Sequence, residues 1–201
     1  TSVVWIATIH STPTPDHERR SAKPRMSSSI GGGSGIWIAP GLILTNEHVV
    51  RNASSMTIVL ADGSRYRVEQ TATTTGHDLA VLRVSFLDGA PLQLDSGPAS
   101  PGKGVVAICG PHFPSVAQCR IGIIDSNTAC LQRELDPRGS HDYSHLVRST
   151  AELQPGFSGG PLIDENGRVI GISVAASGNG QNARGYAIPM SKAIRAVIDE
   201  L

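Results

Sequence analysis

The sequence contains few aromatic residues, no excess of either charge and no long apolar run. Phe, Trp and Tyr together make up 4% of its 201 residues, and Lys plus Arg equal Asp plus Glu at 17 each. A balanced charge gives no support for nucleic acid or a membrane surface as a binding partner. No stretch approaches the roughly 18–20 apolar residues that span a bilayer. We therefore expect no nucleic-acid partner and no membrane segment in this chain.

Cysteine is also scarce, with three residues and no CxxC pair. A structural zinc site uses closer spacing, so we expect no such site and no cofactor. Cys109 ends one strand-like run and Cys119 begins the next. If these runs pair as a hairpin, the two sulfur atoms lie opposite each other and a Cys109–Cys119 disulfide can form. The alternative is two buried thiols that pack as small apolar groups.

Glycine (22 residues) and proline (13 residues) are abundant, and the apolar runs between them are short. About a dozen strand-like runs fall into two groups, at 3–85 and 104–189, joined by a Pro/Gly/Ser-rich connector. This pattern predicts an all-β fold of two antiparallel barrels or sandwiches, divided into residues 1–95 and 96–201. Near the C-terminus, apolar residues recur with helical spacing, which predicts an amphipathic helix with Ser191 at its N-cap.

Two long stretches, 11–34 and 131–145, are polar and show almost no strand pattern. We expect both to be surface loops. Loops of this length in a compact domain are often functional or mobile, and a plain insertion is the alternative interpretation.

Residues 154–164, QPGFSGGPLID, place one serine among three glycines and two prolines. Such a sequence is typical of a tight turn, or of a loop whose backbone approaches a ligand closely. Acyl transfer to serine needs an exposed hydroxyl, a base and donors for the oxyanion. Under the catalytic hypothesis, Ser158 is the nucleophile, and the N–H groups of Gly156 and Ser158 form the oxyanion hole.

Two residues earlier in the chain are candidates for the base and its partner. His48 lies where the run LILTN enters a polar turn, and Asp78 directly precedes the run LAVLRV. Asp78 can accept a hydrogen bond from His48 Nδ1 and hold the tautomer of the ring. Each residue alone also fits an ordinary role, as a half-buried histidine or an aspartate at a strand start. The order His48, Asp78, Ser158 in intact local contexts favours a catalytic triad.

Four segments carry a resemblance to a known family: SGIWIAPGLILTNEHVV, HDLAVLRV, QPGFSGGPLIDENGRVIGIS and GYAIPMSKAIRAVIDEL. Over essentially its whole length the chain resembles the chymotrypsin-like serine proteases and, within them, the HtrA/Deg branch. The resemblance implies two six-stranded antiparallel Greek-key barrels with the site in the cleft between them. It also implies the roles of the triad: Ser158 as nucleophile, His48 as general base and then acid, and Asp78 orienting His48.

The chain departs from this family at two positions near the serine. Phe157 stands where the family usually has asparagine, and an aromatic ring there could disturb the oxyanion loop. Glu152 stands where this branch usually has a small residue, at the base of the specificity pocket in the wider fold. A buried Glu152 would favour a lysine or arginine substrate side chain, and the alternatives are solvent exposure or pairing with Arg148. The resemblance places the walls of this pocket at Ile172, Ser173, Val174 and Gly185.

These observations support three functional hypotheses. The first is a serine endopeptidase that cleaves unfolded or extended polypeptide, bound along the edge strand near Ser173–Ala175. The second is a pseudoprotease of the magnetosome-protein type, repurposed for protein or transition-metal binding, with His77 as a metal-ligand candidate. The third is a latent enzyme that assembles as a homotrimer and is switched on by loop rearrangement. The resemblance implies an extracytoplasmic location, periplasmic or secreted. No PDZ domain follows Leu201, so we expect that it was cut away or that the protein lacks one.

Overall fold

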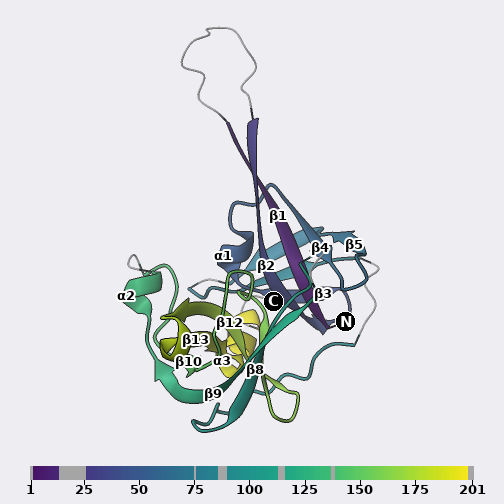
Figure 1. The fold of residues 1–201 in the computed structure, drawn as a ribbon. Helices are drawn as coiled ribbons and strands as arrows, with labels where there is room; N and C mark the ends of the chain where they lie inside the picture. Colours follow the sequence, from purple (N-terminus) through teal and green to yellow (C-terminus); the bar gives the residue numbers. More distant parts are fainter. Residues whose placement is uncertain are drawn as a thin grey trace.

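The computed structural model describes residues 2–13, 26–74, 76–85, 90–112, 116–136 and 139–198. Two antiparallel β-sheets, one from each half of the chain, dominate the structure (Figure 1). None of the helices in the described ranges is long and apolar enough to cross a membrane. The observed architecture confirms the predicted all-β class: short strands separated by turns form one curled sheet and one closed barrel.

The first half forms a seven-stranded sheet in the order β5-β4-β1-β2-β3-β7-β6. Its strands are β1 (Val3–Pro13), β2 (Met26–Ala39), β3 (Leu42–Thr45), β4 (Ser55–Val59), β5 (Arg65–Arg67), β6 (Gln70–Thr73) and β7 (Ala80–Arg83). The sheet curls around a core that includes the fully buried Ile6 and Leu82. A single helical turn, α1 (Glu47–Val50), follows β3 and buries Val49 and Val50 against the same core.

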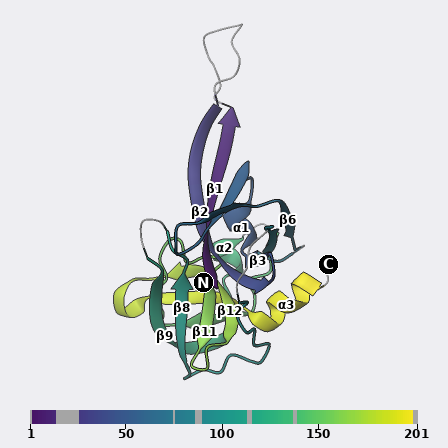
Figure 2. The ribbon, with the colours of Figure 1, turned by 90° about the vertical axis from the view of Figure 1, so that its right-hand side faces the viewer.

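The second half forms a closed six-stranded barrel in the order β10-β13-β12-β11-β8-β9. Its strands are β8 (Gly104–Cys109), β9 (Gln118–Ala129), β10 (Leu146–Ser149), β11 (Pro161–Asp164), β12 (Val169–Ser177) and β13 (Arg184–Pro189). The short helices are α2 (Gln132–Leu135), η1 (Gly180–Asn182) and α3 (Met190–Ile198), and α3 packs against β12 and β13 beside the barrel (Figure 2). The predicted C-terminal helix therefore exists, but it begins at Met190, so Ser191 lies inside its first turn rather than at its N-cap.

One apolar cluster spans the boundary between the two halves. It contains Ile36 and Leu44 from the first sheet together with Leu146 and Ile172 from the barrel, all almost fully buried. Burial of apolar surface stabilises this shared core and fixes the two sheets against each other. The ends of strands from both halves therefore meet at a well-defined seam.

The stretch 26–34 was expected to be part of a polar loop, and the structure corrects this. It belongs to β2, which pairs with β1 in continuous register as far as Pro13 opposite Met26, and forms a projecting two-stranded arm (Figures 1 and 2). Serine and glycine have weak strand propensity, so the pattern was not visible in the sequence. At Gly32, a Cβ atom would come 2.4 Å from the carbonyl oxygen of Ile6, so the close pairing itself requires glycine. The rest of the predicted loop, 14–25, lies outside the described residues.

Of the two alternatives for Cys109 and Cys119, the structure has free thiols and no disulfide, although the hairpin on which the disulfide depended is present. β8 and β9 pair with Cys109 opposite Gln118, one residue out of register with Cys119. Because successive strand residues point to opposite faces, Cys109 is buried while Cys119 is exposed, and both are free thiols.

Candidate active site

A histidine–aspartate pair lies at the edge of the first sheet. His48 is in α1, and its ring Nδ1 lies 2.6 Å from Asp78 Oδ2. The other carboxylate oxygen, Oδ1, accepts a hydrogen bond of 2.8 Å from the backbone N–H of His48. Asn46 fixes the position of the carboxylate by donating a hydrogen bond of 2.8 Å to the Asp78 carbonyl oxygen. The pair therefore has the geometry in which a carboxylate holds one tautomer of an imidazole.

Asp78 is almost completely buried, and its charge is balanced by its neighbours. Burial raises the pKa of this carboxyl group, but the hydrogen bonds from His48 lower it more, so the net pKa lies below its usual value. The hydroxyl of Tyr143 also acts on the carboxylate: burial and the nearby Asp78 charge together raise the pKa of Tyr143. Asp78 is thus held as a carboxylate, and Tyr143 is a neighbour that the sequence pattern did not identify.

Ser158 lies at the seam between the two halves. Its hydroxyl donates a long hydrogen bond of 3.4 Å to the carbonyl oxygen of Val174. Val174 lines one cavity together with His48, and Ser158 lines a neighbouring, smaller cavity. Within the described parts of the chain, no hydrogen bond joins Ser158 to His48. The structure pairs His48 directly with Asp78, whereas the hydroxyl of Ser158 is turned toward the backbone of β12.

The loop before Ser158 presents two backbone N–H groups. Gln154 accepts a hydrogen bond of 3.2 Å from the N–H of Phe157, which closes a four-residue turn. Pro155 and Gly156 occupy the central positions, and Gly156 has φ +100°, as a type II turn requires. No backbone partner for the N–H groups of Gly156 and Ser158 exists in the ranges that the structure describes. Within the described residues, this loop therefore carries two backbone donors that have no backbone partner.

Phe157 does not occupy this loop surface. Its side chain is 1% exposed and packs in the core of the second barrel with Leu153 and Cys109. The guanidinium carbon of Arg120 lies 5.7 Å from the centre of its ring, within the range of a cation–π contact. The ring packs into the barrel, while the backbone N–H of Phe157 closes the turn that carries the N–H groups of Gly156 and Ser158.

Ser34 attaches this loop to the first sheet, and sequence reasoning missed it. Its buried hydroxyl donates to the carbonyl oxygen of Gly156 at 2.7 Å and accepts from the N–H of Gly110 at 2.8 Å. The N–H of Ser34 donates to the carbonyl oxygen of Ser158 at 2.8 Å. At Gly159, with φ +83°, a Cβ atom would come 2.1 Å from the Ser34 carbonyl oxygen, so only glycine fits there. A serine in a Ser/Gly-rich run gives no sequence signal of such a role.

An apolar cavity of about 230 Å³ adjoins Ser158. Its lining residues are Leu153, Gln154, Pro155, Phe157, Ser158, Ala175 and Ala176. Glu152 is not among them: it is exposed, and Arg148 pairs with Asp125 at 2.7 Å instead. Ile172 and Ser173 are fully buried behind the cavity, and Val174 lines the neighbouring one. Gly185 backs the wall, since a Cβ atom there would come 2.8 Å from Leu153 Cγ.

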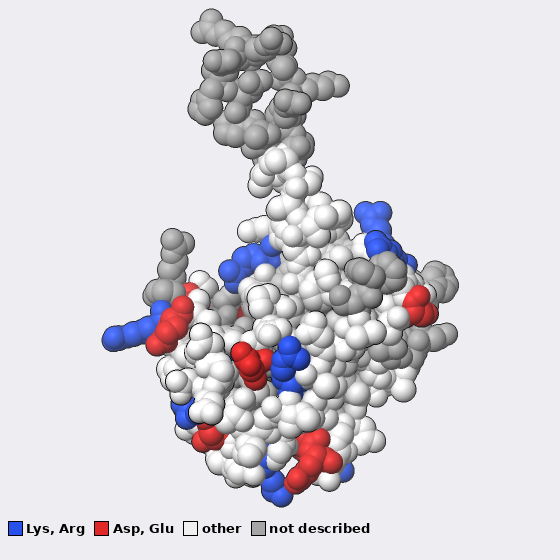
Figure 3. Space-filling view, in the orientation of Figure 1, with Lys and Arg blue, Asp and Glu red and all other residues white. Residues whose placement is uncertain are grey.

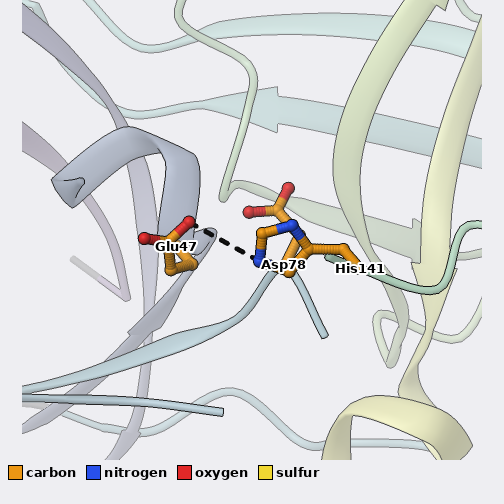
Figure 4. A group of neighbouring side chains, drawn as sticks. All are labelled: Glu47, Asp78 and His141. Atoms are coloured by element: carbon orange, nitrogen blue, oxygen red, sulfur yellow. Dashed lines mark ion pairs between the residues drawn. The ribbon is translucent and has the colours of Figure 1, made fainter. Parts of the chain in front are cut away.

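A larger cavity of about 570 Å³ lies on the other side of His48 and Val174. Glu47 lines it from α1, Arg51 from the residue directly after α1, and His141 from the segment between α2 and β10. Glu47, Asp78 and His141 converge beside it, and their candidate metal-ligand atoms all lie within 4.8 Å of one another (Figure 4). His77, the metal candidate from the sequence, is not in this group and lines a separate cavity with His145.

The comparisons with known proteins agree with this geometry. A family model described as a trypsin-like peptidase domain matches residues 33–172. The chain is 30% identical over 197 residues to a Chlamydia trachomatis protein named "Probable periplasmic serine endoprotease DegP-like", covering 93% of this chain and 36% of the relative. It is 32% identical over 166 residues to the Bacillus subtilis "Serine protease Do-like HtrB", covering 79% of this chain and 35% of the relative.

A solved structure of a variant of the HtrA-type protease AlgW with a decapeptide superposes on the chain with a TM-score of 0.81. The two sequences are 25% identical, and the match covers 98% of this chain and 64% of that one. The chain spans about a third of the length of the curated relatives that it matches.

Proposed function

Because the chain belongs to the trypsin-like peptidase family, with HtrA and DegP proteases among its relatives, we propose that it is a serine endopeptidase. Ser158 is the nucleophile, His48 the general base and Asp78 the residue that orients His48. The single observation that carries the proposal is the bond of 2.6 Å between His48 Nδ1 and Asp78, beside a serine loop with two free N–H groups.

The proposed reaction begins when substrate binding turns the Ser158 hydroxyl from Val174 toward His48. His48 Nε2 accepts the hydroxyl proton as Oγ attacks the substrate carbonyl carbon, and Asp78 stabilises the resulting imidazolium. The N–H groups of Gly156 and Ser158 donate to the oxyanion, an interaction that strengthens as its charge develops. His48 then gives its proton to the leaving amine, and water cleaves the acyl-enzyme by the same sequence of proton transfers.

The proposed substrate is an extended polypeptide segment. β11 pairs with β12 only from Pro161 opposite Ile172 to Ile163 opposite Val169, so the stretch after Ser173 has an open edge on that side in the part of the chain described. A substrate strand can pair with the backbone of Ala175 there, beside the hydroxyl of Ser158. The adjoining cavity of about 230 Å³ is mainly apolar, so we propose cleavage after a small or medium aliphatic residue.

Covalent labelling tests this function directly. A fluorophosphonate probe is expected to label the wild-type chain at Ser158 and to leave Ser158→Ala unlabelled. A quenched peptide with Val or Ala before the scissile bond is expected to be cut by the wild-type chain alone. If the folded wild-type chain is neither labelled nor able to cut an unfolded protein, the endopeptidase proposal is wrong.

A non-catalytic function is the second candidate, and one observation favours it. The Ser158 hydroxyl bonds to Val174 rather than to His48, as in a site that binds polypeptide without cutting it or that waits for activation. Peptide binding without labelling would support a pseudoprotease. Labelling only after an added peptide would support a latent enzyme.

Assembly and location are further parts of the proposal. We propose a homotrimer, supported by the resemblance to the HtrA branch and by the exposed Ile30, which is 84% accessible on the projecting arm. We also propose an extracytoplasmic location, supported by relatives that are named periplasmic. Light scattering of the purified chain checks the first proposal, and fractionation of the source cells checks the second.

A further inference from the structure

Three potential metal ligands converge from separate parts of the chain beside the candidate triad. Glu47 comes from α1, Asp78 from the turn before β7, and His141 from the segment between α2 and β10 (Figure 4). His141 Nε2 lies 3.6 Å from Glu47 Oε2, and all three ligand atoms lie within 4.8 Å of one another. The figure shows the His141 ring directed toward Glu47, to which the dashed line joins it, with Asp78 next to the ring.

This spacing is close to that of ligands around one zinc ion. Nitrogen and carboxylate oxygen bind zinc at about 2.0–2.2 Å in a tetrahedral arrangement, which separates neighbouring ligand atoms by about 3.3 Å. The His141–Glu47 separation of 3.6 Å already approaches this value. The remaining pairs lie within 4.8 Å, so they shorten by at most about 1.5 Å, which rotation of the His141 and Glu47 side chains can supply.

The electrostatics of the cluster favour a cation. The side chains of Glu47, Asp78 and His141 are only 17%, 0% and 12% exposed, so two carboxylates belong to one cluster that water screens poorly. Arg51 offsets part of this charge by hydrogen bonds from Nε and Nη2, both to Oε2 of Glu47. Arg51 and a metal ion can share this carboxylate, because its second oxygen and the remaining lone pairs stay available.

The cavity of about 570 Å³ provides the route for the ion. Glu47 and His141 both line it, together with His48. An ion entering from solvent therefore reaches the ligands Glu47 and His141 before it reaches the deeper Asp78. The same opening leaves room for a water molecule as the fourth ligand, as three-ligand zinc sites have.

We propose that Glu47, Asp78 and His141 form a binding site for a divalent transition-metal ion with the ligand preferences of zinc. An ion held there takes a lone pair of the carboxylate that otherwise accepts from His48 Nδ1. Metal binding therefore loosens the orientation of His48 and reversibly lowers protease activity. This inhibitory consequence rests on the proposed function, whereas binding itself does not.

Metal binding is measured on the full chain carrying Ser158→Ala, so that proteolysis plays no part. Zn²⁺ is titrated against a chromophoric chelator, and Co²⁺ absorbance reports the coordination geometry. We expect one ion per chain and a tetrahedral Co²⁺ spectrum. His141→Ala and Glu47→Gln should each weaken binding at least about tenfold, as the loss of a supporting group around a metal typically does.

Two matched controls identify the site. His145→Ala removes an exposed histidine of the same segment that lines a different cavity, and it should leave the affinity unchanged. A Cys119→Ser, Cys130→Ser double variant removes the two exposed thiols and should also bind normally. Thermal melts establish that each variant is folded, and if His141→Ala is unfolded, Glu47→Gln decides the matter.

Wild-type affinity in a folded His141→Ala or Glu47→Gln chain overturns the proposal, and so does loss of binding in the double cysteine variant. In the wild-type protease, Zn²⁺ should inhibit peptide cleavage, and a chelator should restore it. If the wild-type chain cuts nothing, only the proposed function fails, because the binding result stands apart from it.

Discussion

The attachment of the nucleophile loop to Ser34 can be tested by one substitution. Ser34→Ala removes a hydroxyl that donates to Gly156 and accepts from Gly110, and it leaves the fold of β2 otherwise unchanged. The variant leaves a buried N–H at Gly110 and a carbonyl oxygen at Gly156 without these partners. Since Gly156 carries one of the two free N–H groups, the same change should affect both stability and catalysis.

The size of both effects follows from the hydrogen bonds that are lost. A buried group left without its partner costs about 1–3 kcal/mol, and here two such groups are affected, one of them partly solvated. We expect Ser34→Ala to lower the free energy of unfolding by about 2–4 kcal/mol. Complete removal of an oxyanion donor lowers kcat by about 10²–10³. A loosened Gly156 retains its N–H, so we expect a smaller fall in kcat, of about 10-fold to 100-fold.

Urea unfolding measures the first effect, and hydrolysis of a quenched peptide measures the second. Ser29→Ala on the same strand is the control, because Ser29 is exposed on the arm. The reasoning is refuted if Ser34→Ala keeps the kcat of the wild-type chain. It is also refuted if the loss of stability is below about 0.5 kcal/mol, the lower bound for one net hydrogen bond.

Three further predictions concern the site and its surroundings. Asp78→Asn should lower kcat about 10⁴-fold on a peptide substrate while the chain stays folded, and a fall below tenfold would contradict the role of Asp78. Gly156→Ala should abolish most activity, because φ is +100° there and a side chain strains the turn before Ser158. Gly167→Ala is the control: φ is +78° there in open space, so this change should lower stability alone. Circular dichroism measures the loss of stability, and peptide hydrolysis measures the loss of activity. Although burial raises the pKa of Asp142, the hydrogen bond from Lys192 holds it well below its usual range. Because the folded pKa is depressed, this stabilisation is present above about pH 4 and is lost as the pH falls, so Asp142→Asn should lower Tm at pH 7 and the difference should shrink at pH 3.

The sequence was sufficient to locate the residues with strong local contexts. His48 and Asp78 stand at the boundaries of apolar runs, and Ser158 stands in a glycine-rich turn, so their placement at strand ends could be predicted. Apolar residues of both halves share a core, and the loop of Ser158 bonds to the first sheet through Ser34. The fold class was predictable for the same reason, since turn residues and short apolar runs are local signals.

Other features depend on contacts between distant residues and leave no local signal. Ser34 looks like any serine of a polar run, yet its partners lie in the second barrel. His141 and Tyr143 come from a stretch that was expected to be a surface loop, and they reach the candidate site through tertiary packing. Glu152 was assigned to a pocket by analogy, whereas its exposure depends on the exact path of the loop before Ser158.

The bond between Ser34 and Gly156 joins residues that are 122 positions apart. A growing polypeptide that has completed its first sheet already contains the imidazole and its carboxylate, but it has neither the alcohol nor the barrel that supports it. Under the proposed function, hydrolysis therefore depends on the second barrel, although the base and its carboxylate partner belong to the first sheet.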